Sequence, residues 1–117
     1  MSYIDRDELK LAPYTGEFYT SVIDRDAPLD QQTETEQTIC TVKCDIQQDS
    51  HARYGTNIHA VYRIDVPFSP WDGENVPVQR GNLFRGEQDG LPVIGKVIGV
   101  FSSQLGGWFA FVESNQV

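Results

Sequence analysis

The chain has 117 residues, with 17 acidic and 9 basic side chains that give a formal net charge of −8. This length fits one domain, and the sequence holds no apolar run of about 20 residues, which excludes a membrane-spanning helix. A protein that binds nucleic acid tightly needs clustered Lys and Arg to neutralise phosphates. The chain clusters neither residue, which argues against that class of protein.

The acidic excess lies in the first half of the chain. Residues 1–50 hold 11 acids and 4 bases, a net charge of −7, whereas residues 51–117 hold 6 acids and 5 bases, a net charge of −1. Because like charges repel, such a surface is compatible with DNA that slides past without being held. The start MSYIDRDELK lacks the apolar segment of a secretory signal, which predicts a product that is cytoplasmic when made.

The first 37 residues combine one predicted strand with polar chain. The segment IDRDELKL, residues 4–11, favours a helical turn, and YTGEFYTSVI, residues 14–23, reads as a strand broken by Gly16. Residues 24–37, DRDAPLDQQTETEQ, have no hydrophobic period, which predicts a long loop or a flexible arm. Long loops in compact domains are often functional.

From Thr38 onward the sequence is typical of β structure. Strands are predicted at residues 38–47, 58–68, 76–78, 83–85, 91–101 and 108–113. Turns rich in Gly, Pro and Asp separate them, and a polar loop at residues 47–57 separates the first two. We therefore predict a mainly β fold, a small antiparallel β-barrel or sandwich with long polar loops. Residues 1–37 would form an acidic N-terminal arm and residues 38–117 the β-barrel core, within a single structural domain.

Two cysteines, Cys40 and Cys44, lie in the segment TICTVKCDIQ, whose alternation and β-branched residues predict a strand. At about 3.3 Å per residue, their Cα atoms would lie roughly 13 Å apart along one strand. A disulfide requires about 4.4–6.8 Å, and zinc ligands must crowd around one ion. Buried free thiols are therefore predicted, and the alternative is a metal site that also uses His51 or His59.

Two segments partly match known functional motifs but lack residues or geometry that these motifs require. GLPVIGKV, residues 90–97, nearly matches a phosphate-binding loop, but Val97 has no hydroxyl for Mg²⁺ and the segment reads as buried strand. The residue types of a catalytic triad occur together in Asp49, Ser50 and His51. Three consecutive residues cannot adopt the hydrogen-bonded arrangement that a triad requires. We predict no enzyme, no catalytic or metal-binding residue and no cofactor.

The order of motifs after Thr38 resembles the head-closure (stopper) family of tailed bacteriophages. The resemblance rests on five successive segments: VKCDIQQDS, the loop HARYGTN, the strand end YRIDVPF, the basic-Gly turn VQRGNLFRG and the strand GLPVIGKVIGV. It covers about two-thirds of the chain, and each motif alone is weak because alternating strands and Gly turns are common. The acidic segment before Thr38 has no counterpart in it.

The resemblance implies a β-barrel that assembles as a homo-oligomeric ring, a hexamer or dodecamer, in the neck of the virion. The ring would close the head below the portal or adaptor, line the DNA channel and support tail attachment, after assembly in the host cytoplasm. It would contact passing DNA weakly, without sequence specificity, and would touch no membrane.

Two sets of residues follow from this interpretation. The polar loop between the two long strands would face the lumen, with candidate gating residues Gln47, Gln48, Asp49, Ser50, His51, Arg53 and Tyr54. Candidate contacts to other copies or neighbours are Trp71, Arg80, Arg85 and Trp108; for the two tryptophans, a place in the core is the other favoured reading.

Three other functions stay open. The chain could be another ring component of the same particle, namely a tail terminator, an adaptor or a minor capsid protein. It could be a module that binds a small ligand or carbohydrate, with Trp71 and Trp108 exposed in a groove on a monomer. An enzyme would need acids from distant strands, such as Asp65 and Glu113, to converge in a cleft.

Overall fold

The computed structural model describes residues 11–23, 25–54, 57–69, 71, 75–103 and 106–116. Within these ranges, the side chains of residues 49–54, 57–59, 115 and 116 are outside the description. The predicted helical turn at residues 4–11 lies outside the described residues except for its last position.

Six antiparallel strands form one closed barrel in the order β1-β2-β3-β6-β5-β4. The strands are β1 (Tyr14–Ile23), β2 (Glu34–Tyr54), β3 (Asn57–Val66), β4 (Leu83–Gln88), β5 (Leu91–Ser102) and β6 (Trp108–Gln116), and a short 3-10 turn, η1 (Leu29–Gln31), precedes β2. Strand β1 closes the ring because it pairs with β2 along one edge and with β4 along the other. The predicted mainly β fold is therefore confirmed.

Alternation along the strands builds the core. In β3 the residues Ala60, Tyr62, Ile64 and Val66 are buried, and in β6 Trp108, Ala110 and Val112 face them. Intervening side chains point outward, as the two-residue period of a strand requires. The core is completed by a second set of buried residues, Phe18, Cys40, Val42, Cys44, Ile46, Val78, Phe84, Val93 and Val97.

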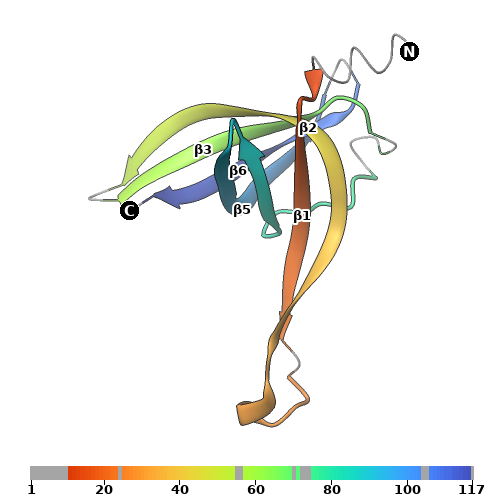
Figure 1. Cartoon of the computed structure of the whole chain (residues 1–117), viewed down its shortest axis with the longest axis vertical. Coiled ribbons are helices and arrows are strands. Elements are labelled where there is room, and N and C mark those ends of the chain that lie inside the picture. The colour runs from red at the N-terminus through yellow and green to blue at the C-terminus, as the bar shows by residue number, and fades with distance from the viewer. Residues whose placement is uncertain are drawn as a thin grey trace.

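Strand β2 changes from β1 to β3 as its pairing partner along its length. Its first part pairs with β1 up to Cys44, and its second part pairs with β3 from Asp45 onward. The register shifts once in each part, beside Phe18 of β1 and between Gln48 and Ser50. Such irregularities bend a strand and increase its twist, and Figure 1 shows β2 curving from one hairpin into the other.

Two hairpins project from the barrel. The β1–β2 hairpin extends downward in Figure 1 and the β2–β3 hairpin extends to the left. The molecule measures 54 × 36 × 29 Å, with a Cα radius of gyration of 16.0 Å, whereas a compact chain of this length would have a radius of gyration of about 13 Å. The molecule is therefore more extended than a compact domain of this length.

Several predicted boundaries are wrong. Residues 24–37 are not one long loop, because Glu34–Gln37 pair with β1, and residues 48–54 continue β2 instead of forming a loop. Residues 34–37 are all exposed, so the pairing of this segment leaves no hydrophobic alternation to read. Residues 76–78 form no strand. The division at residue 37 falls inside β2, and β1, assigned to the arm, is part of the barrel.

Candidate assembly surfaces

The outer half of the β1–β2 hairpin, residues 20–37, is an acidic ribbon that we call the acidic hairpin. It carries five acids and one base, a net charge of −4. Strand β1 pairs with β4 only from Gly16 to Tyr19, so beyond Tyr19 only β2 accompanies it. A two-stranded ribbon is marginally stable by itself in water, yet this one exposes the apolar residues Val22, Ile23 and Leu29.

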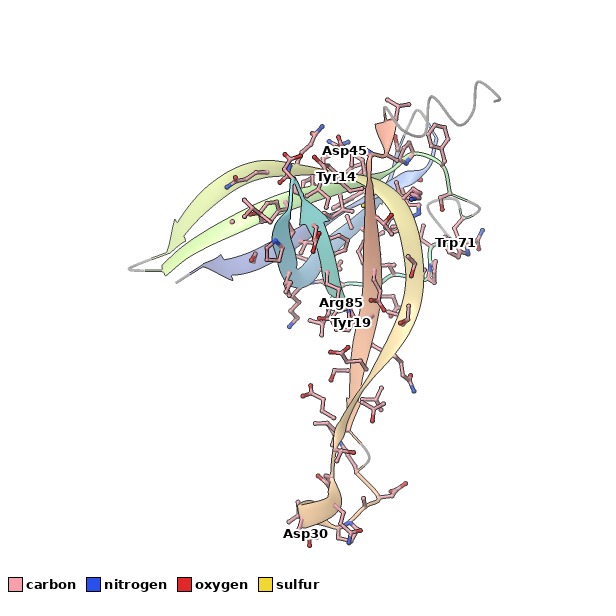
Figure 2. All side chains as sticks on the ribbon, in the orientation of Figure 1. Tyr14, Tyr19, Asp30, Asp45, Trp71 and Arg85 are labelled. Atoms are coloured by element: carbon pink, nitrogen blue, oxygen red, sulfur yellow. The ribbon has the colours of Figure 1, made fainter. Side chains whose placement is uncertain are left out.

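The tip of the acidic hairpin is an ordered turn. The backbone N–H of Gln31 donates to the carbonyl of Pro28 at 2.8 Å, and Nε2 of Gln32 donates to the carbonyl of Ala27 at 3.1 Å. This turn holds Leu29 with 89% of its surface exposed. Figure 2 shows Asp30 at the far end of the hairpin, well away from Tyr19 and Arg85 at its base.

Arg85 of β4 anchors the base of the hairpin. Its Nε donates to Oε1 of Glu17 at 2.7 Å and its Nη1 to Oε2 of Glu36 at 2.8 Å. The guanidinium also lies 4.3 Å from the ring centroid of Tyr19. The hydrogen bond from Arg85, followed by one from the Thr38 hydroxyl, holds the pKa of Glu17 below its usual value. Arg85 thus joins three strands at the point where the ribbon leaves the barrel.

A groove of about 660 Å³ lies over the outer face of β4 and β5. We call it the β4–β5 groove, and its side chains come from Arg80, Leu83, Ile94, Lys96, Ile98 and Glu113. Lys96 and Glu113 are cross-strand partners, so the groove has two bases and one acid. Ile94 has 56% of its surface exposed. The groove is therefore apolar with a small excess of positive charge.

Three phenylalanines of β5 and β6 pack against one another on the outside of the barrel. The ring centroids of Phe101, Phe109 and Phe111 lie 5.5–5.8 Å apart. The guanidinium carbon of Arg63 lies 4.1 Å from the ring centroid of Phe109. Phe101 has half of its surface exposed. Together with Ile94 and Ile98, this cluster makes one side of the barrel apolar on its outer as well as its inner face.

The candidate gating residues lie along the β2–β3 hairpin. Gln47 and Gln48 are exposed, and Nε2 of Gln47 donates to Oδ2 of Asp45 at 2.8 Å. The register shift falls at Asp49, and the backbones of Ser50, His51, Arg53 and Tyr54 pair with β3. The structure therefore places these positions on a ribbon instead of a loop, and it describes no side chain beyond Gln48 in this set.

The four predicted contact residues fall in different places. Arg80 is exposed beside the groove, and Arg85 is part of the hairpin anchor. Trp71 is partly buried against the core. Trp108 is fully buried and packs on Phe18 with ring centroids 5.4 Å apart, so the prediction that it contacts a neighbour is wrong and its core reading is confirmed. Its indole N–H donates to the Ser69 hydroxyl at 2.9 Å, which allows it to be buried.

Sequence reasoning missed the exposed apolar residues Leu29, Ile94 and Ile98. A signal existed for each of them. Leu29 is isolated in a polar acidic segment, and the segment LPVIGKVIGVF is apolar at positions that would face outward as well as inward. An apolar residue on both faces of a strand indicates that the outer face is also covered by something.

Cys40 and Cys44 are both buried and free, as predicted. Burial raises the pKa of both thiols. The neighbouring carboxylates of Asp45 and Asp65 raise the pKa of Cys44 further, so that it reaches about 12 from an ordinary value of 9.0. Because the thiolate is the reactive form, neither group is placed to act as a nucleophile at neutral pH.

The raised pKa of Cys44 predicts a loss of stability in alkali. Below pH 9 the thiol is protonated in both the folded and the unfolded chain, but between pH 9 and about 12 only the unfolded chain releases the proton. The free energy of unfolding should therefore fall as the pH rises through this window. Urea denaturation at pH 8, 9.5 and 10.5 measures the fall, and Cys44→Ala should show a smaller one. An equal fall in both proteins would contradict the assignment to Cys44.

No protein-family model, curated protein or solved structure matches this chain. In the part of the chain that the structure describes, no group of His, Cys, Asp and Glu side chains is arranged to hold a metal ion. Among the same residues, no helix has the length and apolar character needed to cross a membrane.

Proposed function

We propose that the chain is a structural protein of the phage neck, which forms a ring that closes the head, lines the DNA channel and supports tail attachment. The observation that carries this proposal is a small closed barrel from which two long ribbons project in different directions. The acidic hairpin leaves Val22, Ile23 and Leu29 exposed, so it suits contact with other molecules. The ordered series of motifs that resembles the head-closure family supports the same role.

The charge of the chain supports a conduit for DNA. The formal net charge is −8, and a surface of that sign keeps a polyanion moving because it offers few groups that neutralise phosphates. In this proposal the β2–β3 hairpin points to the lumen, where residues 47–57 carry one acid and one base and so offer no basic cluster to hold DNA. The acidic hairpin points to other proteins. A tail terminator, adaptor or minor capsid protein would use the same features and differ only in its neighbours.

A carbohydrate-binding module is supported less well. Such a module would stack its ligand on exposed aromatic rings, and Trp108, one of the two candidate platforms, is fully buried. The exposed Phe101 packs against Phe109 and Phe111 instead, and the rings of Phe109 and Phe111 are inclined at 87°. Rings packed in this way offer no flat platform to a sugar.

Shortening the β2–β3 hairpin tests the proposed gate. Replacement of residues 52–59 by Asn-Gly keeps the pair His51↔Ala60 next to a two-residue turn. We expect particles with the shortened protein to assemble and fill but to lose DNA, because the ribbon no longer reaches the lumen. The measurement is nuclease-sensitive DNA released from purified particles.

The control for this experiment changes the tip but keeps its length. Gly55 and Thr56 are replaced by Asn-Gly, and these particles should retain DNA as the unmodified ones do. Retention of DNA by the shortened variant, in particles that contain the protein in normal amount, would contradict a gating role for this hairpin.

A further inference from the structure

The acidic hairpin and the β4–β5 groove have complementary chemistry within one chain. The hairpin exposes Leu29 among acids, whereas the groove exposes Ile94 and Ile98 beside Arg80 and Lys96. We propose that the acidic hairpin of one copy docks in the β4–β5 groove of the next copy. This inference rests on the proposed ring, and it names the two surfaces that would join its subunits.

The two surfaces cannot meet within one molecule. The pairing of β1 with β2 continues from Tyr19↔Thr38 to Ile23↔Glu34, so the ribbon is an extension of the barrel wall. Arg85 fixes its base, and Figure 2 shows its tip far from that point. A ribbon held in this direction can fill a groove only on another molecule.

Burial gives the contact its driving force. Leu29 is 89% exposed in the single chain, and full burial of a leucine side chain contributes favourably in proportion to the apolar area removed from water. The ordered turn at Pro28–Gln31 already holds this side chain outward, so little conformational entropy is lost on docking. Leu29 is therefore the expected anchor, with Ile94 and Ile98 as its pocket.

Charge sets the direction of the contact. The end of the acidic hairpin carries three acids, Asp26, Asp30 and Glu34, and one base, Arg25. The groove has the opposite balance, with two bases, Arg80 and Lys96, and one acid, Glu113. Complementary charges fix the register of an interface and speed its formation more than they strengthen it. Two unlike surfaces of the same chain make a head-to-tail contact, which generates a ring when its rotation closes.

Cysteine cross-linking between two singly substituted proteins tests the contact. Leu29→Cys is mixed with a size-tagged Ile94→Cys protein under mild oxidation, and the control mixture pairs Leu29→Cys with Lys43→Cys, an exposed position on β2 outside the groove. We expect the mixed disulfide to form at least about tenfold faster with Ile94→Cys, because docking raises the effective concentration of the two thiols. Cys40 and Cys44 are buried and add little background.

Self-association gives a second measurement. We expect Leu29→Asp and Lys96→Glu each to lower the association constant about tenfold in sedimentation velocity, which corresponds to about 1.4 kcal/mol. Lys43→Glu makes the same change of charge outside the groove and should leave the constant unchanged. Thermal unfolding of each variant confirms that the barrel remains folded.

Equal rates of cross-linking at Ile94→Cys and Lys43→Cys would overturn the inference, whether or not the unmodified protein associates. That result would leave the neck function untouched, because that function is judged by DNA retention in particles. Selective cross-linking in a protein that never enters the particle would uphold the docking contact and reject the neck.

Discussion

Replacement of Trp108 by alanine should remove about 3–5 kcal/mol from the free energy of unfolding. This is a large part of the about 5–15 kcal/mol that holds an ordinary domain together. Trp108 is fully buried, packs against Phe18 and donates its indole N–H to the Ser69 hydroxyl. The alanine variant would leave a cavity in the middle of the barrel. Urea denaturation followed by tyrosine fluorescence and circular dichroism measures the loss.

Phe109 provides the matched control for Trp108. It is the next residue on β6, but it faces outward and contacts Phe101, Phe111 and Arg63. Phe109→Ala should cost roughly 1 kcal/mol, since it loses only ring contacts on a half-solvated surface. Equal losses in the two variants would mean that β6 does not alternate between core and solvent as described.

Replacement of Gly107 by alanine should cost about 2–5 kcal/mol in the free energy of unfolding. Gly107 has φ +71°, and a Cβ there would lie 2.1 Å from the carbonyl oxygen of Val66. Val66 pairs with Trp108 at the end of the β3–β6 ladder, so the backbone of β3 would have to move next to the largest core side chain. Chemical denaturation of the variant measures the cost.

Gly106 separates the two causes of that cost. It also has a positive φ, +103°, but a Cβ at this position would have no heavy atom within 4 Å. Gly106→Ala should therefore lose about 1–2 kcal/mol from backbone strain alone, and the remainder seen with Gly107→Ala measures the collision with β3. A loss at Gly106 as large as that at Gly107 would refute the collision.

The sequence was a reliable guide where strands bury one face. The bounds of the first strand, Tyr14–Ile23, were predicted as they occur, and the alternation around Ala60, Tyr62 and Ile64 identified the core face of β3. The burial of Cys40 and Cys44 followed from the same two-residue period. Burial imposes this period, so it can be read without knowing the partners of the strand.

The projecting ribbons escaped prediction for the converse reason. Residues 34–37 and 48–54 extend β2 through backbone pairing with a neighbouring strand, and the side chains of residues 34–37 are all exposed. Only one residue of high β propensity, Thr35, marked the first of these segments. Pairing through the backbone leaves little trace in the sequence when the side chains of a segment stay exposed.

The candidate assembly surfaces depended on closure of the barrel. Arg80 and Arg85 were chosen from the sequence as contact residues, but nothing in their spacing showed that one flanks a groove while the other anchors a hairpin. The groove exists because β4 and β5 lie side by side with Ile94 pointing outward. Such placement is decided by the three-dimensional register, which a single sequence leaves open.

Strand β2 has a consequence for how the protein tolerates change. It runs without interruption from Glu34 to Tyr54 and exchanges its partner between Cys44 and Asp45. One extra residue inserted at that junction would turn every side chain of one ribbon to the opposite face while leaving the other as it is. The uninterrupted strand thus fixes which faces of the two projections lie on the same side, and lengthening either hairpin at its own tip leaves that relation unchanged.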